Sequence, residues 1–138
     1  MTIEWGDLNW LAVIVASVVG YALGAVWYMA LAKPWMAATG LTREIVASRR
    51  QATMRAYVIS VIGSFVGTLA LAVLVQLTGT SDAGSGLALG LLVGVAFIAV
   101  NNAVHDSFEF RPLKLYLINT CYPVLQLALA GLVLGLWQ

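Results

Sequence analysis

The sequence predicts an all-α polytopic membrane protein with four transmembrane helices arranged as two hairpins. Of its 138 residues, 62% are hydrophobic and only 9% are charged, and the mean hydropathy is +0.94. Soluble domains carry about 25% charged residues, because polar side chains must cover their surface. Residues 1–138 are therefore expected to form a single membrane domain.

Four apolar runs are long enough to cross a bilayer, which takes about 20 helical residues at about 1.5 Å each. None alternates apolar and polar residues as a barrel strand does, so each run is predicted to be a helix. The amino terminus carries Glu4 and Asp7 rather than a basic region, so the first run is expected to remain as a span. The predicted spans are residues 8–32, 54–77, 86–104 and 115–137.

The basic residues predict the orientation, because Lys and Arg in short loops stay on the cytoplasmic side. All seven lie in or beside the first and third connections: Lys33, Arg43, Arg49, Arg50, Arg55, Arg111 and Lys114. The opposite face carries only Glu4, Asp7 and Asp82. Both termini are therefore expected outside the cytoplasm, with the loop of residues 33–53 inside.

That loop is expected to contain a short helix capped by Thr42, with Ile45 and Val46 facing lipid. Its arginines would then reach lipid headgroups. Two interpretations stay open: a surface helix attracted to anionic lipid, or a docking site for a cytoplasmic partner.

Glycines recur at four-residue steps, which places small surfaces on one face of each helix and lets backbones approach closely. Four short spans bury little area together, so association of several copies into a homo-oligomer is also expected. The predicted packing glycines are Gly20, Gly24, Gly63, Gly67, Gly86, Gly90, Gly94, Gly131 and Gly135.

Four segments carry a family resemblance: Asn9-Trp10-Leu11-Ala12-Val13, Gly24-Ala25-Val26-Trp27-Tyr28, Pro34-Trp35-Met36, and Phe108-Glu109-Phe110-Arg111-Pro112-Leu113-Lys114-Leu115-Tyr116-Leu117-Ile118-Asn119. In this order, and over nearly the whole chain, they resemble the DUF1761 family of small bacterial membrane proteins. The resemblance implies four spans in a bacterial inner membrane and adds no activity. The chain departs at Cys121-Tyr122-Pro123, where the family pattern is Gly-Tyr followed by a residue other than proline.

One polar face follows the third run. On a helix its side chains fall within an arc of about 140°. Three interpretations stay open: a helix end whose acids pair with Arg111 and Lys114, a vestibule for protons or cations, or a metal site. One histidine with two carboxylates on one helix rarely satisfies zinc, so no metal is predicted. The residues are Asn101, Asn102, His105, Asp106 and Glu109.

A second polar stripe, Asn119, Tyr122 and Gln126, lies within about 60° on the fourth run. Gln126 falls about 16 Å into the membrane, where an amide must face protein or water. Tyr21 and Ser64 have similar depth, so these groups are expected either to line a polar pocket or to make ordinary interhelical hydrogen bonds.

Catalysis has little support, because Ser64 and Cys121 have no histidine or acid on their own spans. No glycine-rich phosphate loop or metalloprotease motif is present, no cofactor is predicted, and a net charge of +1 carries no nucleic-acid signature. The leading hypothesis is a conduit for a small polar solute or ion along both polar stripes and Tyr21. The alternative is a structural or accessory membrane protein without transport, and a third is an enzyme acting on lipid near His105. A dry midplane at Gln126 would favour the structural hypothesis.

Overall fold

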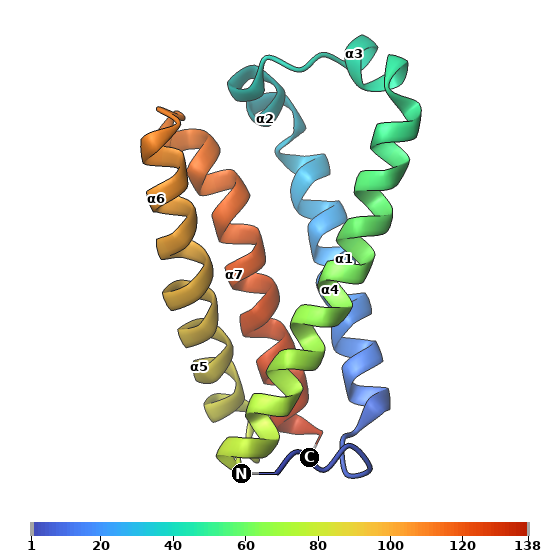
Figure 1. Cartoon of the computed structure of the whole chain (residues 1–138), viewed down its shortest axis with the longest axis vertical. Coiled ribbons are helices and arrows are strands. Elements are labelled where there is room, and N and C mark those ends of the chain that lie inside the picture. The colour runs from blue at the N-terminus through green and yellow to red at the C-terminus, as the bar shows by residue number, and fades with distance from the viewer. Residues whose placement is uncertain (1, 138) are drawn as a thin grey trace.

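The computed structural model describes residues 2–137, and within them the chain is helical, with no strand (Figure 1). Four helical rods are long and apolar enough to cross a membrane by length and composition, as the sequence predicts. The third rod contains three consecutive segments. The rods are α1 (Trp10–Ala30), α4 (Arg50–Thr78), α5–η1–α6 (Ala83–Val93, Gly94–Ala99 and Val100–Phe108) and α7 (Leu113–Leu136).

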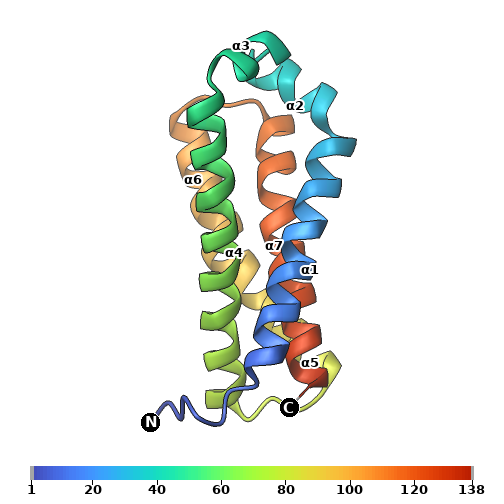
Figure 2. The same cartoon turned by 90° about the vertical axis from the view of Figure 1, so that its right-hand side faces the viewer.

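Both marked termini lie at one end of the bundle, and the α2–α3 segment lies at the other (Figures 1 and 2). The second and third rods extend past the apolar runs read from the sequence, whereas α1 is shorter than its predicted run of residues 8–32. The second rod begins at Arg50 instead of residue 54, and the third ends at Phe108 instead of residue 104. Hydrophobicity marks the thickness of the hydrocarbon, whereas a helix continues into the headgroup layer where charged residues are tolerated.

The first connection contains two short helices, α2 (Ala32–Thr39) and α3 (Arg43–Ser48). The predicted cap of α3 is confirmed: Thr42 Oγ1 accepts a hydrogen bond from the Ile45 backbone N–H at 3.2 Å. Gly40 ends α2 with φ of 72°, a left-handed conformation that glycine adopts without steric cost.

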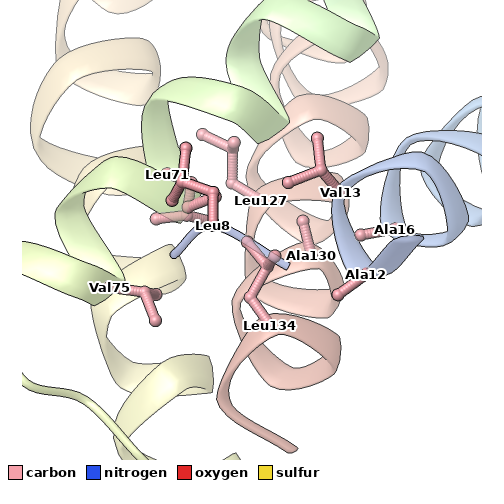
Figure 3. Packing of buried hydrophobic residues seen from close by; sticks show 10 residues of the cluster. Leu8, Ala12, Val13, Ala16, Leu71, Val75, Leu127, Ala130 and Leu134 are labelled. Atoms are coloured by element: carbon pink, nitrogen blue, oxygen red, sulfur yellow. The ribbon is translucent and has the colours of Figure 1, made fainter. Parts of the chain in front are cut away.

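The core fills the half of the bundle nearest the termini, where side chains of α1, α4 and α7 converge (Figure 3). The buried cluster consists of Leu8, Ala12, Val13, Ala16, Leu71, Ala72, Val75, Leu127, Ala130 and Leu134. Asn9 closes this end, because its side-chain N–H donates to the Trp137 carbonyl at 2.8 Å.

Towards the α2–α3 end, α4 separates from the α6–α7 hairpin (Figure 1). Its first half is consequently exposed at Met54, Tyr57, Val58, Ile59, Val61 and Ile62. In a bilayer this apolar surface faces lipid or another protein.

Candidate functional site

Gln126 of α7 begins a hydrogen-bonded chain that crosses three helices, with Ser64 of α4 in the middle. Gln126 is only 8% exposed, and its Nε2 donates to Ser64 Oγ of α4 at 2.7 Å. Ser64 Oγ in turn donates to the Ser17 carbonyl of α1 at 3.1 Å. Ser17 also donates its own hydroxyl to the Val13 carbonyl at 2.7 Å. The amide at the predicted midplane therefore faces protein.

Gly20 and Gly24 open a slot in α1 for two side chains of α7. A Cβ added at Gly20 would lie 2.7 Å from Gln126 Cγ, and one at Gly24 would lie 2.6 Å from the Tyr122 ring. The Tyr122 hydroxyl donates to the Gly20 carbonyl at 3.4 Å, and Tyr28 meets the Tyr122 ring edge-on at a centroid distance of 5.6 Å. These two glycines thus accommodate large polar side chains.

Asn119 forms the end of the stripe nearest α2. Its Oδ1 accepts hydrogen bonds from the Tyr28 hydroxyl at 3.3 Å and from Trp35 Nε1 at 3.1 Å. The residue before Tyr28 on α1, Trp27, donates from Nε1 to the Ile118 carbonyl at 2.9 Å. Tryptophan commonly lies at a membrane–water interface without a specific partner. Here the two indole donors tie α1 and α2 to α7.

The remaining predicted pathway residue, Tyr21 of α1, is half-buried. Thr68, which the sequence gave no reason to single out, lies one turn from Ser64 on α4 and is completely buried. Its hydroxyl has no hydrogen-bond partner among the described residues. A threonine in a helix commonly bonds the carbonyl four residues earlier, so no sequence signal marks this hydroxyl.

The predicted polar face of the third rod divides into three parts. Asn102 points inward and donates to Thr120 Oγ1 of α7 at 3.2 Å. Asp106 and Glu109 both pair with Arg111, whereas Lys114 takes part in no ion pair within residues 2–137.

The third part of this face points outward: Asn101 and His105 are exposed on α6. In the described part of the chain, no group of three histidine, cysteine or acidic side chains is placed to hold a metal ion. The polar face therefore does not converge on one point.

The other predicted packing glycines fall into two sets. Gly86, Gly90, Gly94, Gly131 and Gly135 lie between α5–η1 and α7, where an added Cβ would meet backbone atoms at 2.1 to 3.0 Å. Gly63 and Gly67 of α4 differ, because nothing lies within 4 Å of an added Cβ at either position. The first set permits backbone contact, and the second faces away from the bundle.

The comparisons with known proteins give one result. A family model described as a protein of unknown function, DUF1761, matches residues 11–135. No curated protein and no solved structure matches the chain. The matched region covers nearly the whole chain and includes all four apolar rods almost completely. The chain therefore belongs to the DUF1761 family.

Proposed function

We propose that this membrane protein has a structural or accessory function, and that its polar stripe fastens the helices together instead of carrying a solute. The observation behind the proposal is the chain from Gln126 through Ser64 to the Ser17 carbonyl. A conduit needs polar groups that replace the hydration shell of the solute. At the midplane those groups already bond one another, so admitting a solute would require breaking bonds among α1, α4 and α7.

Interhelical hydrogen bonds of this kind are strong enough, taken together, to hold the helices of a membrane protein to one another. Lipid gives helices no hydrophobic reason to associate, so close packing and interhelical hydrogen bonds hold a bundle together. Each bond contributes about 0.6 kcal/mol on average in a membrane protein. Gln126, Tyr122 and Asn119 bond to three different elements, which supports a cumulative effect of several such bonds.

The experiment compares Gln126→Leu with Asn101→Leu, which removes an exposed amide from α6. Purified protein is reconstituted in liposomes, and the flux of protons, potassium and small polar solutes is measured. We expect the parent to match empty liposomes. We also expect Gln126→Leu to unfold more readily in detergent, while Asn101→Leu unfolds like the parent. Parent flux above the empty liposomes that Gln126→Leu reduces would overturn the proposal.

A second candidate, a conduit between copies of the chain, is favoured by the exposure of Asn101 and His105 on the outer face of α6. Asn101 lies within the apolar run of residues 86–104, where a polar side chain directed at lipid is costly, and an interface between copies would relieve that cost. In a homo-oligomer these residues would lie at such an interface. Cross-linking through cysteines at positions 101 and 105 in membranes, together with flux lost in Asn101→Leu, would favour this candidate over the first.

For the orientation we propose termini outside the cytoplasm and the α2–α3 segment inside, in a bacterial inner membrane. The distribution of the basic residues supports this arrangement. A cysteine introduced at Thr2 should react with a membrane-impermeant maleimide in intact spheroplasts, whereas one introduced at Ala47 should react only after lysis. The single native cysteine, Cys121, would first be replaced by serine.

A further inference from the structure

Positive charge gathers around α2, α3 and the start of α4. This region contains only one carboxylate, that of Glu44. The region also contains five exposed cations. Within residues 2–137 the ion pairs involve Arg111 as the only cation, so none of the five has a carboxylate partner at ion-pair distance. The exposed cations are Lys33, Arg43, Arg49, Arg50 and Arg55.

The α6–α7 turn at the same end of the bundle is different. There Asp106 and Glu109 surround Arg111, and the acids offset the positive charge of Arg111 and Lys114. The excess positive charge is therefore confined to the α2–α3 side and does not spread over the whole end.

The position of α3 places this charge beside the membrane. The helix lies at the end of the bundle, directly before α4 enters its apolar stretch (Figure 2). Ile45 and Val46 are half-buried, while Arg43, Arg49 and Arg50 are exposed. An amphipathic segment with this distribution lies in the headgroup layer of a bilayer.

Glu44 offsets only one of these five positive charges. Hydrogen bonds from its own backbone N–H and from Thr42 lower the pKa of its carboxyl, and the charge of Arg43 lowers it further. The carboxylate is thus engaged at the first turn of α3. Arg49 and Arg50, at the other end of that helix, remain available to an external anion.

We propose that the α2–α3 segment is a binding surface for anionic phospholipid headgroups of the membrane in which the bundle sits. Charge complementarity selects this ligand: an anionic leaflet strengthens association about five-fold for each Lys or Arg near its surface. The segment is already held at headgroup depth by α1 and α4, so its cations meet phosphates without a separate docking step. None of the five cations of this surface bonds to the polar stripe, so the proposal does not rest on the function proposed for that stripe.

The test measures amide hydrogen exchange of residues 41–50 in nanodiscs made of phosphatidylglycerol or of phosphatidylcholine. The variant changes Arg43, Arg49 and Arg50 to glutamine, and a control changes the same three residues to lysine, which keeps the charge. We expect exchange in the parent to be at least about ten-fold slower in phosphatidylglycerol, and about 0.5 M salt to reduce the difference. The glutamine variant should lose the difference and the lysine control should keep it.

Exchange of the glutamine variant in phosphatidylcholine should equal that of the parent, which shows that α3 still forms. Equal exchange of the parent in both lipids would overturn the proposal. So would slowing that occurs in phosphatidylcholine only after a soluble protein extract is added, because that result assigns the surface to a protein partner.

Discussion

The contact between α5 and α7 is close enough for one methyl group to disrupt it, and Gly90→Ala tests this directly. A Cβ at Gly90 would lie 2.1 Å from the Leu127 carbonyl oxygen and 2.7 Å from its carbon. Ordinary van der Waals contact begins at 3.4 Å. The obstacle is backbone and cannot rotate aside, so the helices must separate locally by about 1.3 Å, the difference between 3.4 and 2.1 Å.

Two opposing terms set the magnitude. Inserting a methyl group into a packed interface costs about 1–3 kcal/mol, and a gap of about 1 Å loses up to half of the dispersion energy of the contacts it opens. The Gly86–Gly131 contact one turn away lies in the same seam and would loosen as well. Alanine recovers up to about 1 kcal/mol as the better helix former. The net expectation is a free energy of unfolding lower by about 1–3 kcal/mol.

The assay is reversible unfolding in mixed micelles with an increasing mole fraction of sodium dodecyl sulfate, followed by tryptophan fluorescence. Gly67→Ala is the matched control, because nothing lies within 4 Å of its added Cβ. That variant should be unchanged or more stable by up to about 1 kcal/mol. Equal unfolding midpoints for the two variants would refute the close approach of α5 and α7.

Three further predictions use the same unfolding assay. Thr68→Val removes a buried hydroxyl that lacks a partner among the described residues, so it should raise stability by about 1 kcal/mol; a loss of stability would mean that the hydroxyl is satisfied. Trp35→Phe should cost about 0.6 kcal/mol through the lost bond to Asn119, whereas Trp5→Phe, at an exposed ring, should cost nothing measurable, and equal costs would contradict this assignment. Asp82 caps α5, and hydrogen bonds from the Ser85 side chain and then its backbone N–H lower the pKa of the Asp82 carboxyl. Its stabilisation is present above the unfolded-state pKa and fades below about pH 4, as pH falls through the lowered pKa. Asp82→Ala should therefore lower the free energy of unfolding at pH 7 and reduce its further fall below about pH 4. If stability falls at low pH in the variant as it does in the parent, the Asp82 cap is not the cause of that fall.

The four spans could be predicted because hydrocarbon thickness fixes the length of an apolar run. The segment η1 could not, because a π-helix has no periodicity of its own in the sequence. The helix α2 was also missed. Its Trp35 and Met36 are ordinary headgroup-layer residues, and only the bond to Asn119 shows that the segment folds back onto α7.

The depth of the candidate site in the membrane could be predicted from the sequence, but whether its polar groups face protein or water could not. An amide at the position of Gln126 must be satisfied in the membrane, and Ser64 has similar depth, so the sequence allows the bond that the structure contains. The sequence does not say whether water also occupies the space. That depends on how closely α1 approaches α7, which is determined by Gly20 and Gly24.

The same glycine spacing serves two physical purposes, and the facing residues distinguish them. Opposite α5, the residues of α7 are small, as at Ala128 and Gly131, so the helices meet at the backbone. Opposite α1, they are Tyr122 and Gln126, whose side chains fill the space that Gly20 and Gly24 leave. A side chain seated in such a slot can reach the exposed carbonyl of Gly20 or cross to Ser64. The two glycines of α1 are therefore part of the polar site, because larger residues at those positions would displace the side chains that form it.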